Sequence, residues 1–568
     1  GNTQMSNLLD HVNSPEDIKS FDVPMLNELA REIRDLILQV VLSKGGHLSS
    51  NLGVVELTVA LHYVFDFKKD RLILDVGHQC YAHKILTGRK DEFAALRTKD
   101  GIAGFPKREE SVYDAANTGH SSTSASLACG MLRYGHDGAQ IVALIGDGAM
   151  TGGLIYEAFN DVKAIGKKFI AIINNNDMSI SKNVGSVAEY LRDLDSVRQP
   201  FREYGIKYYG SVDGHNIEEL IKAFTYARDC RNSIIINVHT QKGKGYAEAE
   251  KFPDKYHSYS PSPSSGRSFS SCMGGKLLEL AKRDDKICAI TAAMADGTGL
   301  EKIRSELPGQ FVDVGIAEEH ALCMASGMAI SGAKPYFAVY SSFLQRAYDQ
   351  VIHDMCLNDC AITLCIDRAG FVPGDGETHQ GVYDISYLRS VKNMTILAPK
   401  DFEELENMLE WSAHFYHPLA IRYPKYVPVH KYSVHESFIP GSWEWLTNDG
   451  EEVVVLACGA LMNDFAMSVH DKYGGFDVVN ARSVNPVDEK LLKSIAGKKI
   501  ITLEDNVQPG GFGSGVAEFY IANGIAVPRM IIKAADGSKL THASLSQLMQ
   551  MNGFTEESLL AAVNSLKQ

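Results

Sequence analysis

The chain has 568 residues, 45% hydrophobic content and a formal net charge of −14, and this charge argues against nucleic acid or an anionic membrane as the main partner. A chain of this length can bury more than one core, and about three domains are expected. No apolar run is long enough to cross a bilayer and the ten cysteines are scattered, so we expect a cytoplasmic protein with reduced thiols.

Three loops in the first quarter of the chain carry a histidine. An amphipathic helix over Pro24–Lys44 ends at a Gly-Gly pair, and His47 follows directly. A strand over Leu72–His78 ends in the second histidine, and the segment NTGHSSTS at Asn117–Ser124 places His120 before a helix of small residues. A histidine just past a helix end is often only a cap. Three histidines on loops between buried segments nevertheless favour a functional role over packing.

A strand–turn–helix–strand unit comes next. The apolar run Ile141–Ile145 stops at Gly-Asp-Gly, helical spacing follows over Leu154–Ile165, and a second strand, Phe169–Ile173, ends in three asparagines. In a right-handed βαβ unit both strands end at the same edge of the sheet, where open α/β sheets bind ligands. We therefore expect Asp147 and Asn176 to lie side by side at that edge.

The pair Asp147 and Asn176 offers one carboxylate and one amide oxygen, which are too few to hold calcium. They suit magnesium that keeps other ligands, typically phosphate oxygens. Gly148 lets the backbone approach such a phosphate, and the following helix N-terminus favours negative charge. The alternative is a turn aspartate with no ligand, since Gly-Asp-Gly turns are common. The asparagine-rich turn after the next strand favours a site for magnesium and a diphosphate.

Composition divides the chain into three domains. The first covers residues 1–256 and ends after a Gly-Lys-Gly-Tyr turn, and a stretch rich in Ser and Pro at 257–270 predicts a linker. Alternating strands and helices predict a second domain over 271–425. A connection at 426–450 leads to a third alternating domain, 451–568. We predict an α/β fold of three domains, each a mainly parallel sheet flanked by helices.

The motifs, taken in order along nearly the whole chain, resemble those of thiamine diphosphate enzymes. Gly-Asp-Gly followed a little under thirty residues later by Asn-Asn is similar to the thiamine diphosphate fingerprint. The runs DVGHQCYAHKILTGR, FLQRAYDQ and GDGETHQG resemble the 1-deoxy-D-xylulose-5-phosphate synthase family more closely than transketolases in general, and GGHLSSNLG, TGHSSTS, KGKGY, VGIAEEHA and IDRAG agree with it. The resemblance implies a transketolase-like fold.

The resemblance also implies a site for thiamine diphosphate and Mg²⁺. The metal ligands would be Asp147, Asn176 and the backbone carbonyl of Met178. The residues lining the cofactor would be His78, Gly119, His120, Ser121, Asp147, Gly148, Ala149, Asn176, Tyr246, Glu318 and Phe343. Glu318 would face N1′ of the aminopyrimidine ring, because a carboxylate in an apolar pocket has a raised pKa and can share a proton with a ring nitrogen. Without the resemblance, Glu318 would be an acid at a helix N-terminus with only a dipole role.

The reaction implied is decarboxylation of pyruvate and addition of the remaining two-carbon unit to D-glyceraldehyde 3-phosphate, which gives 1-deoxy-D-xylulose 5-phosphate. This would be the first step of the methylerythritol phosphate route to isoprenoids, and it would also feed thiamine and pyridoxal phosphate synthesis. The residues implied at the substrates are the proton donors and acceptors His47, His120 and His379, the orienting groups Asp375 and Tyr340, and the phosphate ligands Arg346, Arg368 and Arg422. The family further implies a homodimer in the bacterial cytoplasm.

Two departures from the family pattern and two rival functions remain open. Between Val184 and Tyr208 the chain is shorter by some tens of residues, either because the enzyme is naturally compact or because the segment was trimmed, so what covers the site is open. After Tyr423-Pro424 stands Lys-Tyr where the family tends to show Arg-Gly, which weakens the phosphate role of Arg422. The rivals are a transketolase-type ketol transferase and a thiamine-diphosphate-binding paralogue with reduced catalysis. An oxidative decarboxylase would need a lipoyl carrier, which this chain does not supply.

Overall fold

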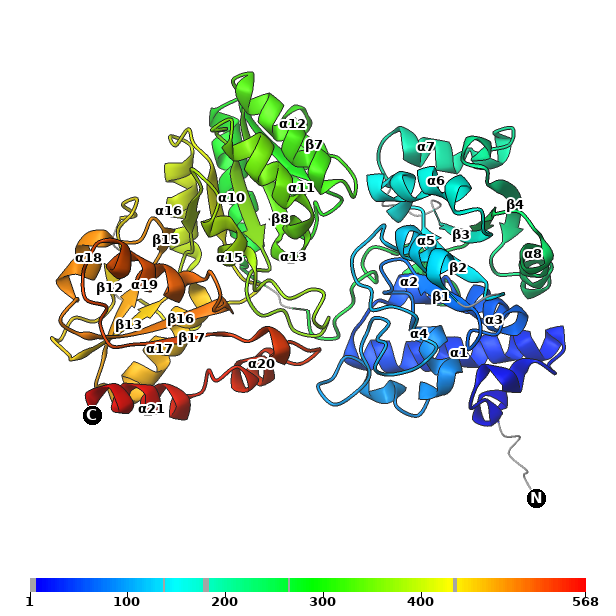
Figure 1. Cartoon of the computed structure of the whole chain (residues 1–568), viewed down its shortest axis with the longest axis horizontal. Coiled ribbons are helices and arrows are strands. Elements are labelled where there is room, and N and C mark those ends of the chain that lie inside the picture. Colours follow the sequence, from blue (N-terminus) through cyan, green and yellow to red (C-terminus); the bar gives the residue numbers. More distant parts are fainter. Residues whose placement is uncertain (1–6, 136–137, 177–182, 264–265, 433–436) are drawn as a thin grey trace. The chain divides into compact units, whose positions relative to one another are not determined.

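The structure, a computed structural model, describes residues 7–135, 138–176, 183–263, 266–432 and 437–568. The chain forms two compact units (Figure 1). Unit 1 comprises Gly1–Ser264 together with the short segment Gly374–Thr378, and unit 2 comprises Ser265–Pro373 and His379–Gln568. No helix in the described ranges is both long enough and apolar enough to cross a membrane.

Unit 1 is built on a five-stranded parallel sheet in the order β1-β2-β3-β5-β4. Its strands are β1 (Arg71–Leu74), β2 (Ile141–Gly146), β3 (Phe169–Asn175), β4 (Lys207–Asp213) and β5 (Ile234–His239). Its helices are α1 (Val23–Lys44), α2 (Leu48–Leu52), α3 (Val55–Val64), α4 (Tyr81–Lys84), α5 (Ser124–Tyr134), α6 (Gly153–Ile165), α7 (Ser186–Arg192), α8 (Ile217–Asp229) and α9 (Ala247–Lys251). The predicted strand–turn–helix–strand unit is confirmed as β2, α6 and β3.

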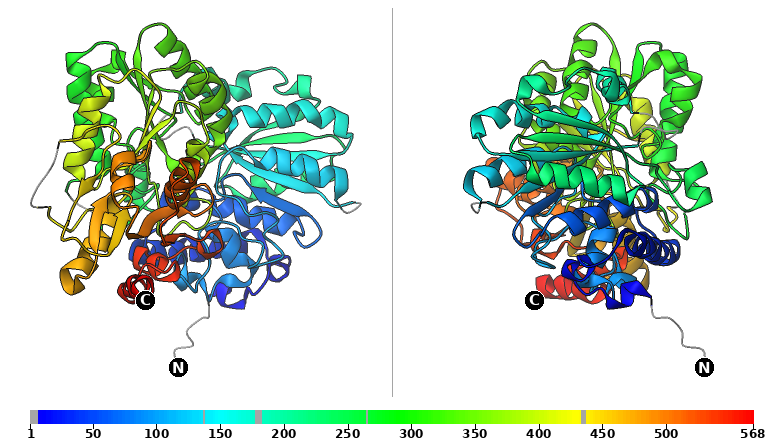
Figure 2. Two further views of the ribbon diagram at one scale, coloured as in Figure 1. Left: turned by 60° about the vertical axis from the view of Figure 1, so that its left-hand side comes forward. Right: turned by 90° about the vertical axis from the view of Figure 1, so that its right-hand side faces the viewer.

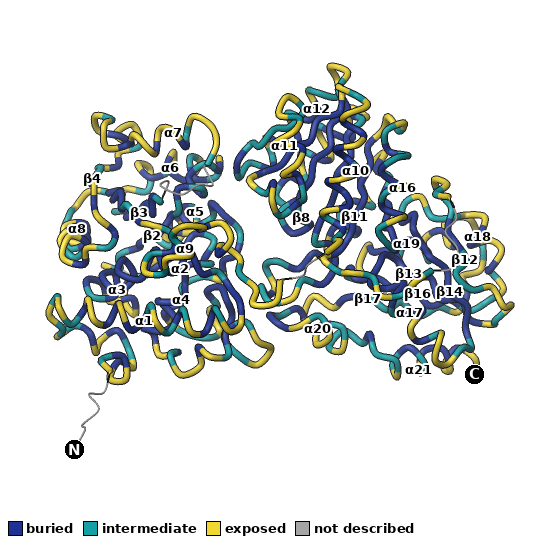
Figure 3. Tube along the Cα trace, turned by 180° about the vertical axis from the view of Figure 1, so that it is seen from behind, coloured by how far each residue is buried: buried dark blue, intermediate teal, exposed yellow. Residues whose placement is uncertain are grey.

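The strands of this sheet alternate their side chains between two cores. On one face Val142 and Leu144 pack with α1, α3 and α8, and on the other Ala143 and Ile145 pack with α5 and α6. This alternation follows from the period of two in a strand, and it requires the continuous apolar run seen in the sequence. Figure 2 shows helices on both faces of the sheet, and Figure 3 is coloured by burial: β3 is buried throughout, and β2 is buried except at Gly146. Only the strand ends remain available to a ligand.

The short stretch between β3 and β4 folds against the carboxyl ends of the strands in unit 1. It contains α7 and two 3-10 helices. The amide Nδ2 of Asn175, at the end of β3, donates to the carbonyl of Leu191 at 2.9 Å. His239, at the end of β5, lies with Nε2 2.9 Å from Oδ2 of Asp195. The shortened segment is therefore attached beside the predicted metal turn.

Unit 2 contains a seven-stranded sheet in the order β15-β10-β11-β9-β8-β6-β7 and a five-stranded sheet in the order β12-β14-β13-β16-β17. The strands are β6 (Ile287–Thr291), β7 (Phe311–Asp313), β8 (Lys334–Tyr340), β9 (Thr363–Asp367), β10 (Thr395–Leu397), β11 (Leu419–Arg422), β12 (Glu444–Trp445), β13 (Val453–Ala457), β14 (Asp477–Asn480), β15 (Ser483–Asn485), β16 (Lys499–Val507) and β17 (Met530–Ala535). The helices are α10 (Phe269–Arg283), α11 (Glu301–Glu306), α12 (Glu318–Ile330), α13 (Ser341–Leu344), α14 (Tyr348–Gln350), α15 (Asp384–Arg389), α16 (Phe402–Ser412), α17 (Ala460–Tyr473), α18 (Glu489–Ser494), α19 (Phe512–Ala522), α20 (Leu545–Met551) and α21 (Glu556–Lys567).

The prediction of three mainly parallel sheets flanked by helices is confirmed, but two strands were missed. β12 and β15 have only two and three residues, and both are antiparallel to a neighbour. β15 follows the third-domain strand β14 in the chain, yet it pairs with β10 in the sheet of the second domain. The second and third domains consequently share one sheet and pack as one unit.

Candidate active site

The carboxyl ends of β2 and β3 place the predicted metal turns at one sheet edge. The backbone N–H of Asp147 donates to the carbonyl of Asn174 at 3.2 Å, and Asn176 directly follows β3. The Asp147 side chain is buried, and the N–H of Gly148 donates to its Oδ1 at 3.1 Å. Met178 lies outside the described residues. The juxtaposition is the one that the βαβ pattern predicts, and the metal role stays a prediction.

The oxygen donors at this edge suit a cation that takes some of its ligands from the protein and the rest from a bound anion. Among the residues that the structure describes, no group of three or more His, Cys, Asp or Glu gathers to hold a metal. A cation there would draw on Asp147, on the amide of Asn176 and on oxygens of the ligand itself, which is the usual way in which magnesium is held beside phosphate groups. These residues are therefore better suited to magnesium bound together with a diphosphate than to a metal held by protein ligands alone.

Three histidine rings, one of them not predicted, pack against one another in unit 1. The ring centroids lie 5.4 Å apart for His47 and His78, 5.7 Å for His47 and His257, and 5.5 Å for His78 and His257. The hydroxyl of Ser50 lies 3.1 Å from Nε2 of His78 and 3.5 Å from Nδ1 of His257. His257 is exposed at one side, but desolvation of its ring by the surrounding protein lowers its pKa to about 4, so this imidazole is neutral near pH 7.

Asn51 fixes the backbone of two of these histidines. Its Nδ2 donates to the carbonyls of His47 at 2.6 Å and His78 at 2.8 Å, and its Oδ1 accepts from the N–H of Tyr81 at 3.0 Å. The Tyr81 hydroxyl in turn accepts from the N–H of His47 at 3.0 Å. Asn51 is fully buried with both ends of its amide satisfied, which holds the two loops in one arrangement. Sequence patterns did not single it out, because His78 and Tyr81 lie 27 and 30 positions away along the chain.

His257 was missed because it stands at the start of the predicted linker. The residues around it are ordered against unit 1: Gly46 and Tyr259 exchange backbone hydrogen bonds of 2.9 and 2.8 Å, and the carbonyl of Tyr256 accepts from the N–H of Leu48 at 3.1 Å. The Ser- and Pro-rich composition of the residues that follow concealed this anchoring. A histidine between two tyrosines, just before the polar stretch, was the available signal.

The segment Gly374–Thr378 belongs to unit 1 and packs on the turn that carries Gly119 and His120. Nε2 of His120 lies 2.7 Å from the carbonyl of Thr378 and donates to it. A Cβ atom on Gly119 would lie 2.2 Å from Oγ1 of Thr378, so only glycine fits there. Asp375 forms an ion pair of 3.0 Å with Arg97, a cation that the sequence motifs did not single out.

Glu318 is the first residue of α12 in unit 2, and its side chain is buried. Burial raises its pKa to about 7, and the nearby cation of Arg346 opposes that shift only in part. Its Oε2 has no hydrogen-bond partner among the described residues. A buried polar atom without a partner costs free energy unless a ligand supplies one. Glu318 therefore fits a ligand that offers a ring nitrogen able to gain or lose a proton.

Four predicted residues gather at the carboxyl ends of β8 and β9 in unit 2. The rings of Tyr340 and Phe343 stack at 5.4 Å with an 8° angle between their planes, and the His379 ring meets Phe343 edge-on at 5.7 Å. The Arg368 guanidinium lies 4.5 Å above the Tyr340 ring. Arg368 has a φ of +49°, a strained conformation for a residue other than glycine. The cluster is an aromatic wall with a cation at one end, and it suits an aromatic ligand next to an anion.

Arg422, at the end of β11, is paired with two acids, whereas Arg368 is paired with one, Asp367, at 2.9 Å. The guanidinium of Arg422 is buried and donates to Asp384 at 2.6 Å and to Asp505 at 2.8 Å. Burial alone would lower its pKa, but the two carboxylates raise it well above the ordinary value. A phosphate would have to compete with these two acids. The phosphate role of Arg422 therefore stays a prediction, and the alternative is a structural role in ion pairs with Asp384 and Asp505.

The remaining predicted residues lie in turns or in and next to short helices, as the sequence predicts. The list is Ser121, buried in the turn after His120, Ala149, the first residue of a 3-10 helix that follows the Gly-Asp-Gly turn, Tyr246, the residue before α9, and Arg346, within the 3-10 helix Gln345–Ala347. Unit 1 therefore holds the candidate diphosphate, metal and imidazole groups, and unit 2 holds the candidate ring-binding acid and aromatic wall.

Comparisons with known protein families agree with this division. The family model described as 1-deoxy-D-xylulose-5-phosphate synthase matches residues 9–199 and 194–240. The model described as transketolase, pyrimidine binding domain, matches residues 266–427, and the transketolase C-terminal domain matches residues 441–559.

Curated relatives named 1-deoxy-D-xylulose-5-phosphate synthase match nearly the whole chain. The relative from Clostridium perfringens (strain 13 / Type A) is 44% identical over 615 residues, covering 98% of this chain and 99% of the relative. The relative from Clostridium tetani is 43% identical over 620 residues, covering 99% and 100%. Both alignments are longer than the chain itself, so both relatives contain residues that have no counterpart here. A solved transketolase from Campylobacter jejuni is 18% identical with a TM-score of 0.43, covering 96% of this chain and 100% of that one. On its sequence identity to these synthases along its full length, the chain belongs to the 1-deoxy-D-xylulose-5-phosphate synthase family of thiamine-dependent transferases.

Proposed function

We propose that the chain forms 1-deoxy-D-xylulose 5-phosphate and CO₂ from pyruvate and D-glyceraldehyde 3-phosphate, using thiamine diphosphate and Mg²⁺. The observation that carries the proposal is the state of Glu318. Its carboxyl group is buried at the start of a helix, its pKa is raised to about 7, and its Oε2 has no partner within the described residues. An acid in this state is expensive for a structural role and suited to proton transfer with a bound ring nitrogen.

Unit 1 would hold the charged end of the cofactor. Asp147, Asn176 and the backbone carbonyl of Met178 are the proposed Mg²⁺ ligands, and the glycine-containing turns allow the diphosphate oxygens to approach the backbone. When bound, the cofactor would supply a carbon nucleophile for the ketone of pyruvate and a place for the electron pair that CO₂ leaves behind. The residues proposed to line it in unit 1 are His78, Gly119, His120, Ser121, Gly148, Ala149 and Tyr246.

Unit 2 would hold the aminopyrimidine ring. Phe343 offers its face to that ring, and Glu318 shares a proton with the ring nitrogen N1′. Because its pKa is about 7, Glu318 is present in both protonation states at neutral pH, so it can give and take this proton with little free-energy cost. A carboxylate with an ordinary pKa would be almost entirely ionised and could only accept.

Unit 1 contains uncharged groups proposed for the substrates, and unit 2 contains the proposed cations. His257 is neutral near pH 7 because its pKa is lowered to about 4, so it can hydrogen-bond to the pyruvate oxygens without adding a charge beside them. His47, His120 and His379 are the proposed proton donors and acceptors, and Asp375 and Tyr340 would orient the substrates. Arg368 is the first candidate for the aldehyde phosphate, since a guanidinium forks onto phosphate oxygens, and Arg346 and Arg422 are the others.

We further propose a homodimer in the bacterial cytoplasm that acts at the start of the methylerythritol phosphate route. Unit 2 exposes large apolar side chains on and near α12, with 68% of Ile330, 64% of Leu357 and 42% of Ile352 accessible. An exposed apolar patch of this kind favours association with another chain. Sedimentation velocity gives the test, and a purely monomeric protein at micromolar concentration would contradict it.

The reaction is tested by the origin of CO₂. With thiamine diphosphate and Mg²⁺ present, the protein should release CO₂ from pyruvate when D-glyceraldehyde 3-phosphate is added, and the product should be 1-deoxy-D-xylulose 5-phosphate. A ketol transferase would instead exchange two-carbon units between sugar phosphates without CO₂. A catalytically reduced paralogue would bind the cofactor and do neither.

The metal turn is tested by titration calorimetry with thiamine diphosphate in the presence and absence of Mg²⁺. Asp147→Ala should abolish the Mg²⁺-dependent part of binding, because it removes the only carboxylate proposed as a ligand. Asp161→Ala is the matched control, since Asp161 is a partly exposed acid on α6 that pairs with Arg133. Mg²⁺-dependent binding that survives in Asp147→Ala would refute the assignment.

A further inference from the structure

The run that most resembles the synthase family contains three polar residues for which the proposed function has no role. They are His83, Lys84 and Arg89, and all three are buried, with 2%, 0% and 4% of their surface exposed. Charged side chains are rarely buried this deeply unless they are paired. Their partners lie in one further segment of unit 1, which carries Glu110 and Asp114.

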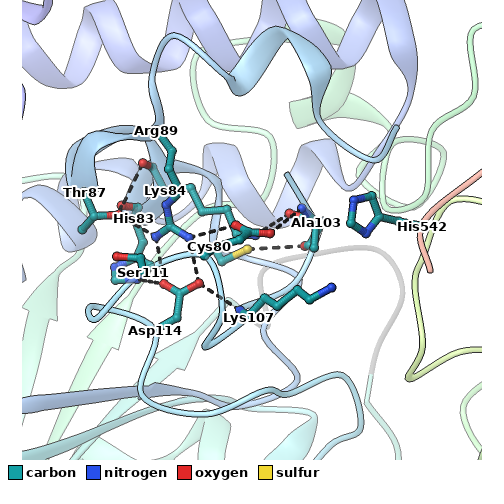
Figure 4. A network of polar contacts seen from close by, with 12 residues as sticks. Cys80, His83, Lys84, Thr87, Arg89, Ala103, Lys107, Ser111, Asp114 and His542 are labelled. Carbon is teal, nitrogen blue, oxygen red and sulfur yellow. Dashed lines mark hydrogen bonds and ion pairs between the residues drawn. The ribbon is translucent and has the colours of Figure 1, made fainter. Parts of the chain in front are cut away.

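The two cations of this group form short hydrogen bonds and ion pairs with its two carboxylates. Arg89 donates to both oxygens of Asp114 at 2.8 Å and to Glu110 at 3.0 Å, and Lys84 donates to Glu110 at 3.0 Å. Figure 4 shows Arg89 and His83 converging on Asp114. The two cations and two carboxylates cancel in charge. This balance is what makes burial tolerable, because a buried charge without a partner would be strongly destabilising.

A pair of imidazoles extends the group without adding charge. Nε2 of His83 lies 2.8 Å from Asp114 and donates to its carboxylate, so Nδ1 of His83 accepts from Nε2 of His62 at 2.9 Å. Burial lowers the pKa of both imidazoles, and both stay neutral. Burial alone would raise the pKa of Asp114, but the hydrogen bonds from Arg89 and His83 hold it well below its ordinary value.

This group fixes a long loop. Between the 3-10 helix Phe93–Ala95 and α5, a stretch described throughout, no helix or strand forms. The loop is nevertheless buried from Ile102 to Pro106. Lys84 Nζ donates to the carbonyl of Ala103 at 2.5 Å, and Glu110 Oε2 accepts from the N–H of Ala103 at 2.8 Å. Side chains thus satisfy backbone groups that secondary structure would otherwise satisfy.

The same loop forms part of the imidazole cluster. The ring of Phe105 meets that of His47 at 5.9 Å. Pro106 packs on the backbone of Gly77, the residue before His78, so closely that a Cβ atom on Gly77 would lie 2.5 Å from the proline ring. The loop therefore touches the ring of His47 and the residue that precedes His78. A displacement of the loop would move both contacts at once.

We propose that His83, Lys84 and Arg89 are positioning residues that hold the loop over residues 101–114 against the imidazole cluster. Their partners in this role are Glu110 and Asp114. Through Phe105 and Pro106 the loop sets where His47 and His78 stand relative to pyruvate. The inference rests on the proposed function, because it assigns these histidines to pyruvate and the cofactor.

The test uses the full chain and the double variant Lys84→Met/Glu110→Gln. It removes one cation and one anion together, so the remaining charges stay balanced and the fold should survive. It also removes the hydrogen bond from Lys84 to the carbonyl of Ala103, while the amide oxygen at position 110 can still accept from the N–H of Ala103. Amide hydrogen exchange in peptides covering residues 101–114 should become faster, and the KM for pyruvate should rise about tenfold, since small misplacements of catalytic groups have large effects. Loss of folded enzyme would lower kcat and leave KM unchanged.

Two further measurements keep the outcome decisive. The stoichiometry of thiamine diphosphate and the Mg²⁺ dependence of its binding should be unchanged, because the Asp147 turn lies outside the group; a change in its affinity would report on His78, which the loop positions. Lys90→Met is the matched control: Lys90 follows Arg89 directly but donates to the carbonyls of Leu9 and Asp10, and its removal should leave exchange in 101–114 and the KM unchanged.

Phe105→Ala tests the far end of the same chain of contacts without touching the ion pairs. It should reproduce the rise in the KM for pyruvate, and adding it to the double variant should have little further effect. An unchanged KM in Phe105→Ala, or unchanged exchange in a folded double variant, would overturn the inference. If the unaltered protein released no CO₂ from pyruvate, the proposed function would fail, while the exchange result would still decide whether the group holds the loop.

Discussion

Asp114 in unit 1 and Glu318 in unit 2 are two acids that are almost equally buried, with 4% and 5% of their surface exposed. Their pKa values move in opposite directions. Arg89 and His83 hold the pKa of Asp114 below its ordinary value despite burial, whereas burial raises the pKa of Glu318 to about 7. Asp114 has a partner for each oxygen, and Oε2 of Glu318 has none among the described residues.

The difference shows that partners, and not burial, decide what a buried acid can do. An acid whose hydrogen bonds are complete stabilises the fold and is locked in one protonation state. An acid with a missing partner costs stability and is left able to exchange a proton with a ligand. We expect the first kind of site to tolerate substitution poorly in the free protein. The second kind should tolerate it well until turnover is measured.

Glu318→Gln gives the largest expected effect, and without that effect the contrast between Glu318 and Asp114 would not hold. Turnover should fall by about 10²–10⁴-fold, because the amide keeps the shape but cannot transfer a proton. Affinity for thiamine diphosphate, measured by calorimetry, should change little. Glu301→Gln is the control, since Glu301 is an exposed acid that also opens a helix in unit 2. Full activity in Glu318→Gln would remove the proposed role.

Arg89→Met tests whether its partners allow Asp114 to stabilise the fold. It leaves Asp114 buried with only part of its compensation, so the free energy of unfolding should fall by about 3–5 kcal/mol. Glu318→Gln should leave that free energy unchanged or raise it. Denaturant unfolding of unit 1, followed by hydrogen exchange, measures the first effect. A double variant, Arg89→Met/Asp114→Asn, should recover part of the loss, and no recovery would show that charge balance is not the reason.

The pH dependence of stability should also separate the two acids. The ordinary pKa of a glutamate is 4.5 and that of Glu318 is about 7, so the folded protein binds the extra proton between these values and loses stability as pH rises through them. Asp114 is lowered from 3.8, so its contribution is complete above that pH and is lost only in acid. The melting temperature of Glu318→Gln should therefore equal that of the unaltered protein near pH 4.5 and exceed it at pH 8. Equal temperatures at both pH values would contradict the raised pKa.

His257→Asn should give the smallest effect. The amide retains hydrogen-bonding capacity beside Ser50 but not the ring, so kcat/KM for pyruvate should fall by about tenfold if the imidazole contacts the substrate. The pH profile near neutrality should keep its shape, because His257 titrates near pH 4. A lost alkaline or acid limb near pH 7 would mean that this histidine is charged during turnover.

The parts of the fold that the sequence predicted are those with long regular patterns. β2, α6 and β3 follow from apolar runs interrupted by glycine and asparagine, and the position of Asp147 beside the end of β3 follows from the parallel direction of the two strands. β12 and β15 could not be predicted in this way. Two or three residues carry no periodicity, and the pairing of β15 with β10 depends on the packing of two domains.

The site divides in the same manner. Glu318 was named only through the family resemblance, because nothing in the local pattern distinguishes it from other acids at helix starts. Asn51 and Arg97 were not named at all, since their roles depend on residues distant in sequence; Arg97 and Asp375 are 278 positions apart. His257 was hidden by the composition of the residues after it. Long-range hydrogen bonds of this kind become visible only in three dimensions.

The strand β15 has a consequence for how such enzymes can be recombined. Ser483–Asn485 supplies the edge of a sheet whose other strands come from the preceding domain, and Asn485 Nδ2 donates to the carbonyl of Met394 at 2.8 Å. A gene fragment that stops after the second domain would leave β10 with an unpaired edge, a known route to aggregation. Chimeras between relatives should therefore exchange β10 and β15 as a matched pair and not divide the chain at the obvious connection between the domains.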